Sequence, residues 1–138
     1  MSAFARVVAA LIGLAVAASA FLPWAGDTSA WHLHVRSIFS VGEPDGATLA
    51  TSMGTVVAAA GLLIALGALV NGRPLVIIGA LLAVAVPAIW IFGNAVSSSA
   101  GAVPIARIQI GAFASAVGGF MALILAAVAR DTRTPTLR

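Results

Sequence analysis

Hydrophobic residues make up 62% of this 138-residue chain and charged residues only 8%, whereas an ordinary soluble domain has about 25% charged residues. The formal net charge is +3, and the seven basic residues, all Arg, are spread singly along the chain. That spacing excludes the basic patch of a nucleic-acid-binding protein. The absence of cysteine excludes disulfides, thiolate chemistry and Cys-ligated metal centres.

Four apolar stretches without a charged residue in their interiors cover roughly residues 4–22, 49–70, 75–92 and 110–129. Each is about long enough for a helix to cross a hydrocarbon core of about 30 Å. Within a bilayer, backbone groups are satisfied only in helices or closed barrels. The sequence therefore predicts an all-α membrane protein, with residues 1–138 forming a single domain. The predicted fold is a bundle of four transmembrane helices with a short β-strand or hairpin in the loop after the first helix.

The first stretch has a second interpretation. Arg6, the apolar run Val7–Ala17 and the tripeptide Ala18-Ser19-Ala20 resemble a signal peptide with its cleavage site. Cleavage within residues 1–20 would leave three spans. The apolar run continues to Trp24, however, which gives it full membrane length and favours a retained first helix.

The Arg residues are distributed unequally between the two sides of such a bundle. With a cytoplasmic N-terminus, Arg36 and Arg107 lie outside and the other five inside, as the positive-inside rule requires. The three Trp residues then lie at the outer interface, where indole rings are enriched. We predict a multi-pass protein of the plasma or inner membrane with both termini cytoplasmic and residues 130–138 as a cytoplasmic tail. The inner arginines are Arg6, Arg73, Arg130, Arg133 and Arg138, and the tryptophans are Trp24, Trp31 and Trp90.

The first outer loop, residues 23–47, is the only sizeable polar segment. From Trp31 to Val41 apolar and polar residues largely alternate, and a period of two predicts a half-buried β-strand. Such a strand needs a partner for its edges, either a hairpin strand such as Val103–Ile110, the helix ends or another subunit. The predicted contact residues on its packed face are Trp31, Leu33 and Val35.

Small residues recur at helical spacing in several of the predicted helices, and such stripes allow close helix packing in lipid. One interpretation is packing within the bundle. The other is that the fourth helix packs inside with one stripe and binds a second copy or a partner with the other. The predicted packing residues are Gly54, Gly61, Gly111, Ser115, Gly118 and Gly119.

Two further features have a structural and a functional interpretation. Pro87 lies in the outer half of the third stretch and predicts a kink, because proline removes a helical hydrogen bond; a static kink is favoured over a hinge. His32 and His34 would share one face of the predicted strand and could bind a metal ion with Asp27, Glu43 or Asp45. We favour a polar strand edge and predict no metal site.

The residue arrangements that catalysis and ion-coupled transport require are missing from the sequence. No ionisable residue lies in the interior of an apolar stretch, whereas ion-coupled carriers need one. The chain also lacks paired carboxylates, a Ser/His/Asp set and a phosphate-binding Gly-rich loop. We therefore predict no catalytic residues, no cofactor and no enzymatic activity, and a solute carrier is disfavoured.

Three features of the chain occur together. They are the stretch Phe21-Leu22-Pro23-Trp24-Ala25, the polar loop after it and a Gly-rich last helix ending at Arg130. In this layout the chain resembles the small four-pass membrane proteins of actinobacteria and their phages, which commonly have Leu-Pro-Trp after the first span. The resemblance implies a four-helix membrane fold and little about activity.

Together these features predict a non-enzymatic integral membrane protein that acts through contacts, as an accessory or assembly subunit of a membrane complex. The expected partners are the lipid bilayer and other membrane subunits or further copies of the chain. The alternative is a membrane-permeabilising or channel-forming protein, of the phage-exclusion or toxin type.

Overall fold

The computed structural model describes residues 1–38, 48–96 and 108–129. Its described part contains four α-helices, which confirms the predicted helical fold: α1 (Ala3–Ser19), α2 (Met53–Leu69), α3 (Arg73–Val96) and α4 (Ile110–Val128). Between α1 and α2 lie a small antiparallel sheet, β1 (Pro23–Ala25) with β2 (Thr28–Ser29), and two 3₁₀ turns, η1 (Ala30–His32) and η2 (Val35–Ile38).

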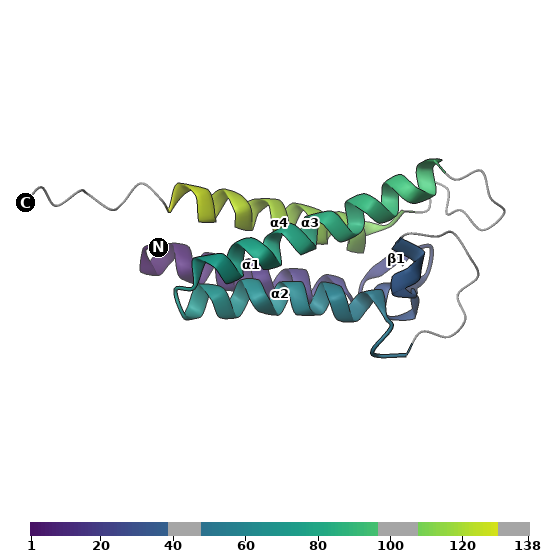
Figure 1. The fold of residues 1–138 in the computed structure, drawn as a ribbon, viewed down its shortest axis with the longest axis horizontal. Coiled ribbons are helices and arrows are strands. Elements are labelled where there is room, and N and C mark those ends of the chain that lie inside the picture. The colour runs from purple at the N-terminus through teal and green to yellow at the C-terminus, as the bar shows by residue number, and fades with distance from the viewer. Residues whose placement is uncertain (39–47, 97–107, 130–138) are drawn as a thin grey trace, which may run out of the picture.

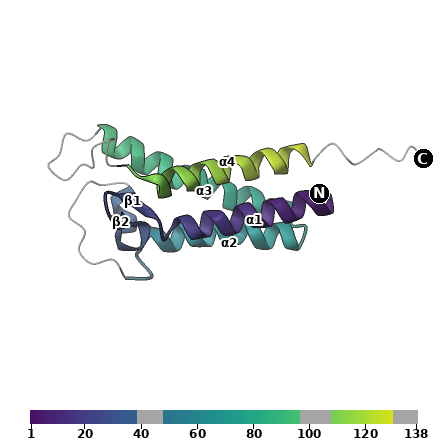
Figure 2. The same cartoon turned by 180° about the vertical axis from the view of Figure 1, so that it is seen from behind.

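The helices run alternately up and down (Figure 1), and helix α1 packs against α2 and α4, while α3 packs against the same two helices from the other side. We call the end of the bundle that carries β1 and β2 the loop end. The opposite end, with Met1, the turn between α2 and α3 and the last residues of α4, is the turn end. Figure 2 shows the same division of the bundle from behind.

Serine caps mark the starts of α1 and α2. The Ser2 hydroxyl accepts a hydrogen bond from the Ala5 N–H at 3.2 Å, and the Ser52 hydroxyl accepts one from the Gly54 N–H at 3.0 Å. Helix α2 therefore begins at Met53 rather than at Leu49, because a capping side chain satisfies N–H groups that would otherwise lack a partner. The preceding residues Thr48 and Thr51 form a turn closed by their own backbone and hydroxyl groups.

The turn between α2 and α3 is tight. Asn71 has a φ of 53°, a left-handed conformation that asparagine tolerates better than most residues. The Gly72 N–H donates to the Gly67 carbonyl at 2.7 Å, and Pro74 lies in the first turn of α3, where its missing N–H costs nothing. This turn makes α2 and α3 an antiparallel hairpin.

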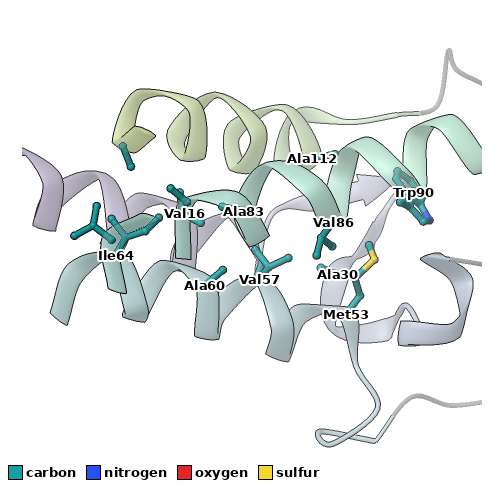
Figure 3. Close-up of a cluster of buried hydrophobic side chains, with 14 of the residues drawn as sticks. Val16, Ala30, Met53, Val57, Ala60, Ile64, Ala83, Val86, Trp90 and Ala112 are labelled. Atoms are coloured by element: carbon teal, nitrogen blue, oxygen red, sulfur yellow. The ribbon is translucent and has the colours of Figure 1, made fainter. Parts of the chain in front are cut away.

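Alanine and glycine are frequent among the buried residues of the helices, whereas most of the large apolar side chains are exposed. The core shown in Figure 3 extends from Ile64 towards the turn end to Trp90 at the loop end, with alanines such as Ala60 and Ala83 between them. The closest approach joins α1 and α2, where a Cβ atom on Gly13 would lie 2.6 Å from the backbone of Gly61. The helices therefore pack nearly backbone to backbone.

Each described helix exposes large apolar side chains. Examples from successive helices are Leu11 (61% exposed), Leu66 (54%), Ile78 (50%) and Phe120 (60%). By length and composition, two helices in the described part of the chain, α3 and α4, could cross a membrane. Helices α1 and α2 are apolar but shorter, at 17 residues each.

The predicted strand from Trp31 to Val41 is wrong for residues 31–38. Trp31 and His32 belong to η1, and Val35 opens η2. Only the short link between them is extended, and it forms a single bridge from His34 to Ser52. The buried side chains of this segment, Ala30 and Leu33, are three residues apart, which is the period of a 3₁₀ turn rather than that of a strand. The residues 39–41 lie outside the described part.

Candidate functional site

The folded segment over the loop end is the candidate site, since it is the main polar structure outside the helices in the described part. We call residues 20–36 the cap. It consists of β1, β2, η1 and the first residues of η2. Backbone hydrogen bonds join it to two helix starts: the Gln109 N–H donates to the Trp24 carbonyl at 3.0 Å, and the Met53 N–H donates to the Leu33 carbonyl at 2.8 Å.

Trp24 anchors the cap inside the bundle. Its side chain is fully buried, and its Nε1–H donates to the Ser19 carbonyl at 2.9 Å, at the end of α1. Its ring centroid lies 6.0 Å from that of Trp90 on α3, with the planes tilted by 60°, a geometry favourable for aromatic pairs. Gly111 on α4 leaves room for the indole, because a Cβ there would lie 2.6 Å from Trp24 Nε1.

Trp24 and Trp90 contact the chain's own helices rather than presenting their rings on the surface of the bundle. Both lie at the loop end, but they are 0% and 1% exposed and face the bundle interior. Tryptophan is enriched at membrane interfaces because its apolar ring carries one polar N–H. In Trp24 that N–H is already satisfied by a protein carbonyl, so the ring can be enclosed.

Trp31 packs over the start of α2. A Cβ on Gly54 would lie 2.7 Å from the indole, so the glycine receives the ring. The Phe21 ring, which is 70% exposed, covers the same indole at a centroid distance of 5.2 Å. Gly54 and Gly111, both predicted to pack against helices, therefore both receive tryptophan rings from the cap.

Ser52 fixes the cap to α2. Besides capping the helix, its buried hydroxyl donates to the carbonyls of Trp31 at 2.9 Å and Ala30 at 3.2 Å. A second backbone bond runs from the Val35 N–H to the Thr51 carbonyl at 2.7 Å. The polar groups at this junction hold the cap in place rather than facing a ligand.

The predicted outer-loop contact residues lie mostly against the chain's own helices. Leu33 is buried, and Trp31 and Val35 are half-buried and pack on the core. The residues that the cap exposes are instead Phe21, Leu22, Asp27, His32 and Arg36.

The two histidines engage in local hydrogen bonds. His32 Nδ1 lies 3.1 Å from the Ser29 hydroxyl, and His34 Nδ1 accepts from the Arg36 N–H at 3.1 Å. No three metal-ligating side chains gather among the described residues. Glu43 and Asp45, which we considered as further ligands, lie outside them, as does Arg107.

The other predicted packing residues lie between helices of one bundle. Gly61 meets Ala17 and Gly13 of α1. On α4, a Cβ on Gly118 would lie 2.6 Å from Val16 of α1, and one on Gly119 would lie 2.8 Å from the Ala80 carbonyl of α3. Gly118 and Gly119, which belong to different small-residue stripes of α4, therefore face two neighbouring helices of the same chain.

Sequence reasoning missed a link between Pro87 and Ser115. Helix α3 continues through Pro87, whose missing N–H leaves the Ala83 carbonyl, four residues earlier, without its helical donor. The buried Ser115 hydroxyl of α4 donates to that carbonyl at 3.0 Å. Pro87 and the small-residue stripe that contains Ser115 were both apparent in the sequence. Only the packing register of α3 against α4 places Ser115 next to the Ala83 carbonyl.

Comparisons of the chain with protein-family models, curated proteins and solved structures found no match.

Proposed function

We propose that this chain is a non-enzymatic, four-span integral membrane protein that works through contacts, as an accessory or assembly subunit of a membrane complex. The observation that carries the proposal is that all four helices bury many small residues and expose most of their large apolar side chains. Soluble monomers rarely expose contiguous apolar patches larger than a few hundred Å². Lipid is the solvent that suits such a surface.

The length of α1 and α2 is compatible with this proposal. A 17-residue helix is about 26 Å long, slightly less than a hydrocarbon core of about 30 Å. The residues after α1 extend its apolar surface, because Phe21 and Leu22 continue in turns with hydrogen bonds to Ala18 and Ser19. The exposed side chain of Leu49 does the same before α2.

The contact surface for a partner would be the exposed side of the cap, with Asp27 and His32. Polar and charged side chains stand there on a segment held rigidly by Trp24 and Ser52. Such a surface can recognise a partner without ordering a loop on binding.

Packing inside the bundle supports contacts over conduction through a single copy. The axis is filled by residues with no exposed surface, among them Val16, Val57, Ile64 and Ala83. A pore would require several copies or a different arrangement of the helices. The test below distinguishes the accessory role from the alternative, permeabilisation of the membrane.

The test uses a photo-crosslinking residue placed at Asp27 or His32 in the full-length chain in its native membrane. We expect one specific adduct from each of these cap positions. The same residue at Leu14, on the exposed apolar face of α1, should give lipid adducts only. Absence of an adduct from the cap, together with collapse of the membrane potential on expression, would replace the accessory role by permeabilisation.

A further inference from the structure

Among the described residues, positive groups lie at the turn end of the bundle and no acidic side chain lies there with them. They are the α-ammonium group of Met1 and the guanidinium groups of Arg6 and Arg73. Among the described residues the one acidic side chain is Asp27, which belongs to the cap at the opposite end. The turn end therefore has a net positive charge that the described part of the chain does not neutralise.

The N-terminus is tied to the turn that carries Arg73. The Met1 ammonium donates to Asn71 Oδ1 at 3.4 Å, and the Met1 side chain packs against the core. Arg6 lies at the same level, because Gly13 of α1 packs on Gly61 and Ala65 of the antiparallel α2. Seven residues before Gly13, the chain is level with the end of α2. All three cations thus belong to one end of the bundle.

The two arginines are half-buried, with one nitrogen enclosed. Nε of Arg6 and Nε of Arg73 are buried and have no hydrogen-bond partner in the described structure. A guanidinium carries a delocalised charge and binds phosphate oxygens in a planar fork. An anion at the remaining edge of each guanidinium would compensate for the positive charge that the described residues leave without an acidic partner.

Exposed apolar side chains lie in the same segments as the cations. Phe4 and Val7 on α1 are 80% and 59% exposed, and Leu69, Val70 and Leu75 beside the turn are 64%, 66% and 38% exposed. A free phosphate ion would use only the cations. A phospholipid would use both parts of the surface, with its headgroup at the arginines and its acyl chains along the helices.

We propose that the turn end binds an anionic phospholipid, with Arg6 and Arg73 as the ligands of its phosphate. The inference rests on the four-span placement proposed above, because only that placement brings the turn end to headgroup depth. Each cation near a membrane surface contributes about fivefold to the binding of anionic lipid, and two contribute roughly thirtyfold.

The experiment titrates the full-length chain, in neutral detergent, with phosphatidylglycerol and with phosphatidylcholine of the same acyl chains, and follows bound lipid by native mass spectrometry. We expect preference for phosphatidylglycerol, a loss of about fivefold in its association constant for Arg6→Gln or Arg73→Gln, and about thirtyfold for both. Arg36→Gln, which removes one positive charge at the loop end, should change nothing. Changing both Arg6 and Arg73 to Lys keeps the positive charges and should therefore keep most of the preference for phosphatidylglycerol. This control shows that the loss in the Gln variants comes from the lost charge and not from misfolding.

Three results would contradict the proposal. Wild-type affinity for phosphatidylglycerol in the double Gln variant would exclude these arginines. Equally tight binding of inorganic phosphate, in competition with the lipid, would make the site a free-anion site. Extraction of the reconstituted chain from vesicles at alkaline pH would instead contradict the membrane placement itself, and this readout does not depend on lipid preference.

Discussion

Ser115 repairs a hydrogen-bond defect that Pro87 creates on the neighbouring helix. A carbonyl buried in an apolar bundle without a donor costs about 1–3 kcal/mol, and Ser and Thr side chains commonly compensate for proline in membrane helices. The Ala83 carbonyl receives the Ser115 hydroxyl at 3.0 Å. The pair therefore joins α3 to α4 by a specific polar contact within an otherwise apolar interface.

The first prediction at this scale is a coupling between the two residues. Ser115→Ala should lower the free energy of unfolding by about 1 kcal/mol. In a Pro87→Ala background the same change should cost clearly less, because residue 87 then donates its own N–H to Ala83. The measurement is reversible unfolding of the wild type, the two single variants and the double variant in detergent micelles. An equal cost of Ser115→Ala in both backgrounds would contradict the repair.

Leu33 gives the second residue-scale prediction. Leu33→Asp should destabilise the protein by about 3 kcal/mol or more, because it places a charge in the buried contact between the cap and α2. The matched control is His32→Asp, the same new side chain at the exposed neighbouring position, which should cost little. Similar losses of unfolding free energy in the two variants would contradict the inward orientation of Leu33.

At the scale of elements, glycine decides how closely α1 and α2 approach. A Cβ on Gly61 would lie 2.5 Å from the Gly13 carbonyl oxygen, so no other residue fits unless the helices separate. Such an approach replaces the large interlocking side chains of soluble bundles by backbone contact, which is typical of helix packing in lipid.

Gly61→Leu should therefore destabilise the bundle by about 1–3 kcal/mol, the usual cost of overpacking. Ala59→Leu adds a comparable side chain on the exposed side of the same helix and should be nearly neutral. Thermal unfolding in detergent, with the buried Trp24 and Trp90 as fluorescent reporters, compares the two. If the Gly61 variant is as stable as the Ala59 variant, the approach of α1 to α2 is not required for the fold.

At the scale of the whole molecule, the alternating helices place Met1 and the end of α4 at one end of the bundle and the cap at the other (Figure 1). In the proposed four-span arrangement these ends lie on opposite sides of the membrane. The excess of arginine in the segments expected at the turn end favours a cytoplasmic location for it.

This arrangement can be tested by thiol labelling, because the chain has no cysteine of its own. Ser2→Cys and Asp27→Cys introduce thiols at exposed positions of the turn end and of the cap, respectively. We expect an impermeant maleimide added to intact cells or right-side-out vesicles to label position 27 only, and position 2 only after the membrane is opened. Labelling of both positions from one side would contradict the four-span arrangement.

Local chemistry in the sequence was sufficient to predict the four helices. The apolar stretches near residues 4–22 and 110–129 correspond closely to α1 and α4. The composition and length of a segment are properties of that segment alone, so they predict a helix without knowledge of its neighbours. The Ser52 cap shortened α2 at its start, and α3 extended beyond the predicted stretch to Val96. The prediction of a short hairpin after the first helix was right, but the hairpin is Pro23–Ala25 with Thr28–Ser29, before the predicted strand.

Only the tertiary structure decided where the tryptophans and small residues point. The sequence by itself determined that Gly54, Gly111 and Ser115 are small, but whether a small residue receives a helix backbone, an indole ring or a hydroxyl bond depends on what lies opposite. That neighbour comes from residues up to about 90 positions away, as Trp24 does for Gly111. Periodicity reports which side of a segment is apolar, whereas the register between segments arises from packing, which acts only when the chain is folded.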